Sequence, residues 1–319
     1  MIKQSTFKPA CYLPNRHLQT ILPSIIHPIS PVCEKERVEL ADGDFIDLVW
    51  SRVRSDTTLL ILHGLEGSIR SSYAKRILNY CNQHQISAVL MHFRGCSGEP
   101  NRLLRSYHSG VTDDLRLVIE HLKSQNVSRI ALLGYSLGGN LVLKYMGESG
   151  ADPSIHCAVA ISVPLRLDIC ADTMNRGFAK FYQSNLLKRM VEKIKQKRGL
   201  LEQSSLSFPI PGSMRNFREF DDCFTAPIHG FDGAQHYYHS CSSRQFLAHI
   251  EKPVLIIQSF DDPFMSPEVL PSEDELSTAV TLELSSHGGH AGFYQSGALK
   301  PRSWLEPRVH RFLIEQQYI

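Results

Sequence analysis

The sequence has no long hydrophobic run and little excess of charge of either sign. No stretch of about 18 apolar residues occurs in the 319-residue chain, so we expect no transmembrane helix. The first nine residues, Met1 to Pro9, lack the apolar core of a signal peptide, and we expect a cytoplasmic protein. The net charge of +2, from 34 Lys and Arg against 32 Asp and Glu, is too small to indicate a nucleic-acid partner.

The sequence also lacks paired cysteines. Its 8 cysteines are scattered without a Cys-x-x-Cys pair, and several lie inside apolar runs, as Cys157 does within residues 156–161. This pattern indicates buried, reduced thiols rather than a disulfide framework. We expect no cofactor and no metal ion.

Short apolar runs alternate with helical patterns along the chain, which is typical of a mostly parallel central sheet flanked by helices. The expected parallel strands are rich in Val, Ile and Leu and lie at residues 58–62, 87–91, 129–133, 158–163, 253–258 and 279–284. Helices are expected at 73–83 and 112–124, and an antiparallel hairpin at 38–50. The pattern predicts a single α/β domain over residues 1–319.

The alternation stops between Pro164 and Lys252. This segment is too long for a simple crossover helix, and we interpret residues 164–252 as an inserted helical cap. Within it, residues 177–201 carry an apolar helical stripe, and the expected opposite face is basic, with Lys188, Arg189, Lys193, Lys195, Lys197 and Arg198. That face is either the solvated side of a helix packed on the core or a surface in weak contact with anionic lipid headgroups.

A Gly-x-Ser-x-Gly motif lies at Gly134 to Gly138. An apolar run leads into it and a helical pattern follows, so Ser136 is expected on a sharp strand-to-helix turn. Such a strained turn needs small residues two before and two after the serine. Ser136 is our candidate nucleophile, at a helix N-terminus where free N–H groups and the helix dipole favour an oxyanion.

A serine nucleophile needs a base and an orienting carboxylate. Where the serine lies on such a strand-to-helix turn, the acid follows it along the chain and the histidine follows the acid. Two adjacent acids, Asp261 and Asp262, come directly after the strand at 253–258, and only one of them can meet the histidine. We favour Asp262, because many hydrolases carry the acid just before a proline, here Pro263. Asp261 stays the alternative.

The base is expected in the glycine-rich segment after the last strand. His290 is our candidate, because the glycines around it give a loop that can bring an imidazole back over Ser136. His287 is the alternative base. The two histidines could also share a metal ion, but neither a helix nor an obvious third ligand supports such a site.

Two backbone N–H groups are expected to form an oxyanion hole. The first belongs to Leu137, the residue after the nucleophile. The second comes from the loop after the strand at 58–62, where Leu65 is our candidate between Gly64 and Gly67. His63 is expected to brace this loop rather than to titrate in catalysis.

With these residues in place, the chain resembles the YheT-like branch of the α/β-hydrolases, which includes ABHD-type lipases and plant embryogenesis-associated hydrolases. Besides the motif at Ser136 and the segments around Asp262 and His290, the resemblance is carried by strings at Asn15–Thr20, His63–Ser68, Phe93–Gly98, Tyr107–Gly110 and Thr225–Phe231. It implies an α/β-hydrolase fold and a Ser-Asp-His hydrolase of carboxylic esters. Short-chain acyl esters or lipid esters are the implied substrates.

Other functions stay open at this point. An acyltransferase or a thioesterase could use the same residues, because the choice of acceptor depends on how well the cap excludes water. A non-catalytic binding protein would be favoured by a missing member of the triad, and none is missing. The Phe93–Gly98 string follows a strand and could line the pocket, although we expect it to be structural. Cys96 within it has no base beside it in the sequence, so we do not expect a second nucleophile there.

Overall fold

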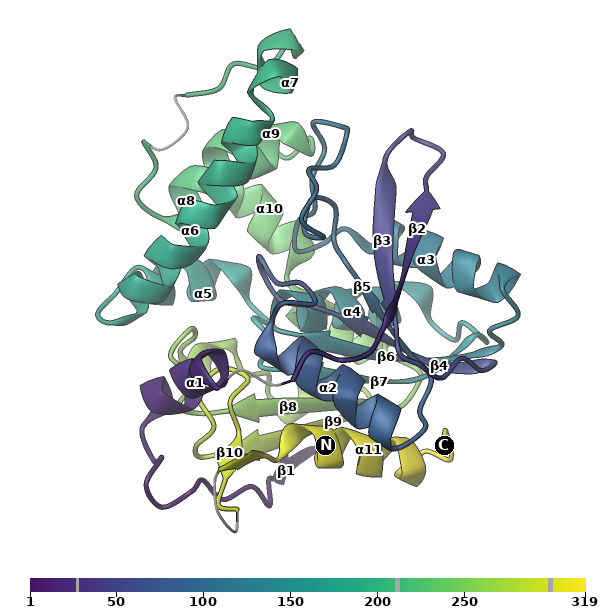
Figure 1. The fold of residues 1–319 in the computed structure, drawn as a ribbon. Coiled ribbons are helices and arrows are strands. Elements are labelled where there is room, and N and C mark those ends of the chain that lie inside the picture. Colours follow the sequence, from purple (N-terminus) through teal and green to yellow (C-terminus); the bar gives the residue numbers. More distant parts are fainter. Residues whose placement is uncertain (27–28, 210–212, 298–300) are drawn as a thin grey trace.

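The computed structural model describes residues 1–319 except 27–28, 210–212 and 298–300. Its centre is a sheet with nine strands in this described part (Figure 1). In spatial order these are β1 (Ile2–Gln4), β9 (Val280–Ser285), β8 (Val254–Ser259), β7 (Ile155–Ile161), β6 (Arg129–Tyr135), β4 (Thr57–Leu62), β5 (Ala88–Met91), β3 (Phe45–Trp50) and β2 (Glu34–Glu39).

The sheet is mostly parallel. The strands from β1 to β5 in this order pair in parallel. Among the described strands of this sheet only β3 runs the other way, because it pairs antiparallel with both β5 and β2. Central strands such as β4 and β8 are almost entirely buried, because helices cover both faces. The predicted fold class, strands and hairpin are therefore confirmed; β1, a parallel edge strand, was not foreseen.

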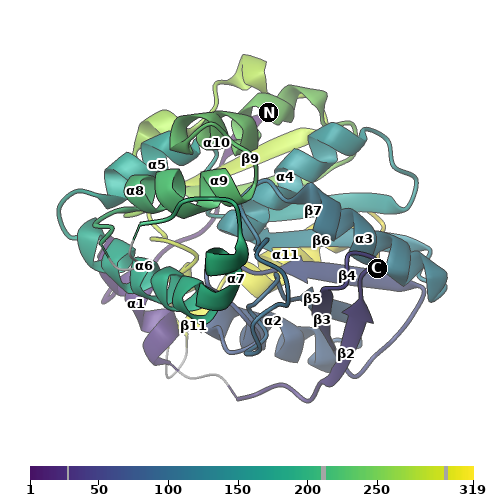
Figure 2. The same ribbon diagram turned by 90° about the horizontal axis from the view of Figure 1, so that it is seen from above.

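Helices cover both faces of the sheet (Figure 2). On one face, α3 (Thr112–Ser124) and α4 (Leu137–Ser149) pack in one apolar core. On the other face, α2 (Ser72–Gln83) and α11 (Leu305–Glu315) pack in a second core. The sheet thus separates two cores. The carboxyl ends of its parallel strands lie side by side, and the loops that follow them can bring their side chains together.

Between β7 and β8 the chain forms helices that stand to one side of the sheet (Figure 1). We call residues 164–252 the inserted segment. Its helices build a third apolar core of their own. In its described part they are α5 (Leu167–Met174), α6 (Ala179–Gln196), α7 (Arg198–Gln203), α8 (Phe217–Phe220), a π-helical turn (Asp221–Thr225), α9 (Ala226–Ile228) and α10 (Ala234–Cys241), and a 3₁₀ helix (Ser243–His249) follows.

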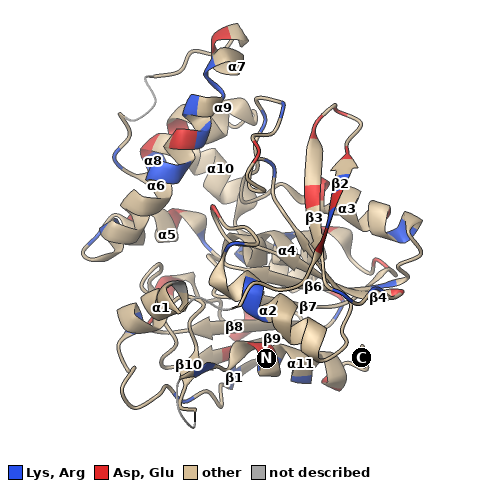
Figure 3. Cartoon of the chain, in the orientation of Figure 1, with Lys and Arg blue, Asp and Glu red and all other residues tan. Residues whose placement is uncertain are grey.

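Two lysines of the inserted segment do not lie on a solvated basic face. Lys197 is buried and Lys193 half-buried, whereas Lys188, Arg189, Lys195 and Arg198 are exposed. Figure 3 shows basic residues recurring along α6 and α7. The prediction that Lys193 and Lys197 lie on the basic face is wrong. Long lysine stems pack along apolar surface, and here their ammonium groups bond to distant loops.

Further elements outside the predicted pattern complete the fold. Helix α1 (Arg16–Ile25) is capped by Asn15, whose side chain accepts hydrogen bonds from the N–H groups of His17 and Leu18. A short ladder joins β10 (Tyr294–Gln295) to β11 (Arg302–Ser303). In the residues described, none of the helices combines the length and apolarity needed to span a bilayer.

Candidate active site

Ser136 lies on a strained turn between β6 and α4. Its backbone has φ 53° and ψ −119°, a conformation that residues with side chains rarely adopt. A Cβ added at Gly138 would lie 2.5 Å from the carbonyl oxygens of His63 and Leu62, and one at Gly134 would overlap the Gly138 carbonyl. The glycines of the motif are therefore required by close backbone approach.

Asp262 and His290 form a pair in which the carboxylate is buried and the imidazole half-buried. Asp262 Oδ2 lies 2.8 Å from His290 Nδ1, and the carboxylate is only 1% exposed. Its other oxygen accepts a hydrogen bond from the N–H of Phe264 at 2.8 Å. The Phe264 ring stacks on the imidazole, with ring centroids 3.9 Å apart. This arrangement fixes the histidine and leaves its Nε2 available.

Asp261 and His287 form a separate contact. Asp261 accepts a hydrogen bond from the N–H of Gly289 at 3.0 Å, and its second oxygen lies 3.4 Å from His287 Nδ1. The structure thus brings Asp262, not Asp261, to His290. Among the described residues there is no cluster of three His, Cys, Asp or Glu side chains that could hold a metal.

Helix α1 supports the loop that carries His290. The N–H of His290 donates to Thr20 Oγ1 at 2.9 Å. A Cβ added at Gly289 would lie 2.5 Å from the Arg16 carbonyl oxygen, and one at Gly292 would overlap the Gln19 carbonyl. Sequence reasoning missed this role of α1, although the string Asn15–Thr20 in the family resemblance was a signal for it.

The loop after β4 places Leu65 beside Ser136. A Cβ added at the neighbouring Gly64 would lie 3.2 Å from Ser136 Cβ, which shows how closely this loop approaches the elbow. In the described part of the chain, the N–H of Leu65 makes no hydrogen bond. Leu137 is the first residue of α4, where helix N–H groups lack intrahelical partners.

His63 braces this loop, as expected. Its Nδ1 lies 2.8 Å from the Gly64 carbonyl oxygen, and its Nε2 accepts the N–H of Phe93 at 3.1 Å. Complete burial lowers the pKa of His63 to about 3, so the imidazole stays neutral.

A cavity of about 150 Å³ joins these groups. Ser136, Leu137, Leu65 and His290 all line it, together with side chains of the inserted segment. Most of the lining is apolar, including Leu167, Met174, Leu186, Met190, Ile194, Phe217, Phe220, Phe224 and Phe264. Among the described residues, Ser136 Oγ makes no hydrogen bond, so the hydroxyl faces the cavity unpaired.

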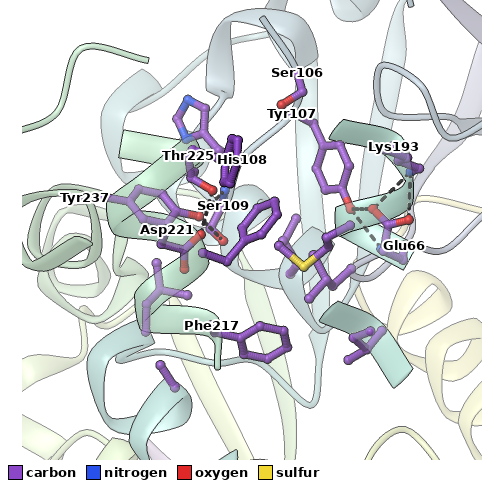
Figure 4. Close-up of a pocket in the computed structure, with 18 of the residues that line it drawn as sticks. Glu66, Ser106, Tyr107, His108, Ser109, Lys193, Phe217, Asp221, Thr225 and Tyr237 are labelled. Carbon is purple, nitrogen blue, oxygen red and sulfur yellow. Dashed lines mark hydrogen bonds and ion pairs between the residues drawn. The ribbon is translucent and has the colours of Figure 1, made fainter. Parts of the chain in front are cut away.

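Two polar clusters interrupt the apolar lining (Figure 4). In one, Tyr237 bonds to Ser109, close to the buried carboxylate of Asp221, whose pKa burial raises to about 6. In the other, Glu66 contacts Tyr107 and Lys193. Sequence reasoning singled out neither cluster as functional, because each joins segments far apart in the chain.

Residues 57–296 match the family model described as the alpha/beta hydrolase fold. The chain belongs to this family. The YheT protein of Escherichia coli (strain K12) is 39% identical over 317 residues, covering 96% of this chain and 92% of that protein. The human phospholipase ABHD3 is 28% identical over 326 residues, covering 97% of this chain and 78% of that protein.

The fold of this alpha/beta hydrolase also matches solved structures. The Pyrococcus furiosus esterase Pf2001 superposes with a TM-score of 0.59, covering 98% of both chains at 16% identity. At that identity the match speaks for the fold alone.

Proposed function

We propose that this alpha/beta hydrolase cleaves carboxylic esters with Ser136 as nucleophile, His290 as base and Asp262 as the orienting acid. The observation that carries the proposal is the 2.8 Å contact of Asp262 with His290 beside the same cavity that Ser136 lines on its strained elbow. A buried acid, a histidine with one free ring nitrogen and an unpaired serine hydroxyl are the parts that nucleophilic acyl transfer needs.

The proposed reaction proceeds through an acyl-enzyme. Neutral His290 takes the Ser136 proton at Nε2 while Oγ attacks the ester carbonyl, and Asp262 stabilises the imidazolium that forms. The N–H groups of Leu65 and Leu137 bind the oxyanion of the tetrahedral intermediate. His290 then protonates the leaving alcohol, and water repeats the sequence to release the acid and free Ser136.

The proposed substrates are esters with at least one apolar part. The largely apolar cavity supports this, since each methylene group that enters it leaves water. The human relative is a phospholipase, which agrees with a lipid ester as the substrate. A short-chain acyl ester would fit the same lining.

We propose a cytoplasmic location, which the eight free cysteines support. Exposed basic residues of α6, among them Lys188, Arg189 and Lys195, support weak contact with anionic lipid headgroups. Sedimentation with anionic and with zwitterionic vesicles tests this contact. A protein that binds neither kind of vesicle, or binds both equally, would contradict it.

Rapid-mixing kinetics with p-nitrophenyl butyrate test the proposed reaction. We expect a burst of nitrophenol close to one equivalent per chain, or steady turnover when deacylation is fast, and loss of both in Ser136→Ala. Butyrate ester formed from a dilute added alcohol in preference to butyric acid would make the enzyme an acyltransferase. Equal activity of Ser136→Ala would overturn the assignment of the nucleophile.

A further inference from the structure

One side chain of the inserted segment reaches the loop that carries Leu65. Lys193, in the last turn of α6, places its Nζ 2.9 Å from Glu66 Oε2 and 3.0 Å from Glu66 Oε1. Glu66 immediately follows Leu65, and its side chain is only 4% exposed. A contact from α6 therefore ends one residue away from a proposed oxyanion donor.

Glu66 itself has a strained backbone. Its φ of 55° lies in the left-handed region, which a residue with a side chain adopts only when its surroundings hold it there. Tyr107 holds it from two sides: its hydroxyl accepts the Glu66 N–H at 2.9 Å and donates to Glu66 Oε1 at 2.7 Å. The conformation of the turn thus depends on where the Glu66 carboxylate is anchored.

Lys193 completes that anchor. Besides pairing with Glu66 beside the Tyr107 hydroxyl (Figure 4), its Nζ lies 5.3 Å from the centre of the Tyr107 ring. The same Nζ donates to Cys96 Sγ at 3.0 Å. Carboxylate, phenol and ammonium converge from three segments that are distant in the sequence. The pKa of Lys193 is raised by the neighbouring Cys96 and Glu66 against the effect of its burial, so the ammonium stays charged.

We propose that Lys193 is a positioning residue that links the inserted segment to the oxyanion hole. By holding the Glu66 carboxylate, it keeps the turn in the conformation that presents the unpaired N–H of Leu65 to the cavity. The hole is then complete only while α6 is docked on the loop. This inference rests on the proposed function and extends it to the control of the site by the inserted segment.

Lys193→Met tests the proposal, because it removes the charge and keeps the length of the side chain. We expect kcat for an ester to fall about tenfold or more with KM little changed, since the loss concerns the transition state. The inhibition constant of a trifluoromethyl ketone, whose adduct with Ser136 carries an oxyanion, should rise by a similar factor. Lys193→Arg, which can still pair with Glu66, should recover most of the activity.

Arg76→Met is the matched control. Arg76 pairs at 2.9 Å with Glu306, a carboxylate that is 5% exposed, and the pair lies between α2 and α11, away from the cavity. This variant also leaves a buried carboxylate without its partner, so its thermal midpoint should fall as in Lys193→Met. Its kcat and its inhibition constant should stay near those of the wild type.

Two results would overturn the inference. One is an active wild type whose Lys193→Met variant keeps kcat and the affinity for the ketone. The other is an equal loss of kcat in folded Arg76→Met, which would make the effect one of general stability. A wild type without any ester hydrolysis would instead contradict the proposed function itself.

Discussion

At the scale of single residues, the site depends on which way neighbouring side chains point. Asp261 and Asp262 are adjacent, yet one bonds to the N–H of Gly289 and the other to His290. Because the backbone turns after β8, the two carboxylates serve different partners. One of them supports the loop, and the other meets the ring that faces the cavity.

Asp262→Asn should therefore lower kcat/KM by about 10⁴, since an amide favours the wrong tautomer of the histidine. Asp261→Asn should stay within about tenfold of the wild type, because it changes a contact to the loop and not to the base. Steady-state ester kinetics of both variants check this pair. The reverse ranking would assign the acid to Asp261.

His63 gives the fold a measurable dependence on pH. Its pKa falls from 6.5 in a solvated histidine to about 3 in the folded protein, so between these values the unfolded chain binds more protons at this group. Stability is therefore lost as the pH falls through that window. From pH 7 to pH 5 this single group should lower the free energy of unfolding by about 2 kcal/mol.

Urea unfolding at the two pH values measures this term. The loss of stability on acidification should be smaller in His63→Gln, which has no titrating ring, than in the wild type. The same pH dependence in both proteins would show that His63 does not contribute it.

At the scale of elements, the His290 loop depends on α1. The backbone of Gly292 lies so close to the Gln19 carbonyl that no Cβ fits between them, and Thr20 accepts the His290 N–H. The catalytic candidate from one end of the chain is thus positioned by a helix from the other end.

Gly292→Ala should displace this loop and lower kcat about 100-fold or more, because a shift of about 1 Å in a base is enough for that. Gly199→Ala is the control, since an added Cβ there meets nothing within 4 Å and the residue lies in α7. That variant should keep full activity and gain about 0.5–1 kcal/mol of stability. Full activity of Gly292→Ala would show that α1 does not set the position of His290.

The sequence predicted the elements that local patterns determine. Apolar runs and the motif at Ser136 located the strands, the elbow and the loop of His290, and the fold class is confirmed. The partners of Lys193 and the support from Thr20 could not be predicted, because both are contacts between distant segments. Lys193 was also assigned to a solvated face, since a helical pattern does not show where a long side chain bends.

At the scale of the whole molecule, the cavity lies between the inserted segment and the loops at the carboxyl ends of the parallel strands. Loops after β4, β6 and β9 supply Leu65, Ser136 and His290, and the inserted segment supplies most of the apolar lining. The candidate catalytic groups and most of the apolar lining thus come from different parts of the chain.

This division predicts a dependence on acyl chain length. From acetate upward, kcat/KM for p-nitrophenyl esters should rise about fourfold per methylene group until the cavity is full, at about 0.8 kcal/mol for each buried group. Ala171→Phe, which narrows the lining, should move the optimum to a shorter chain. Equal kcat/KM for all chain lengths from two to sixteen carbons would contradict binding of the acyl chain in this cavity.

The most direct test of the central claim is the mass of the intact protein after treatment with a fluorophosphonate probe. An activated serine at the elbow predicts one added phosphonyl group in the wild type and none in Ser136→Ala. No labelling of the folded wild type, or labelling that persists in Ser136→Ala, would contradict the claim that Ser136 is the nucleophile.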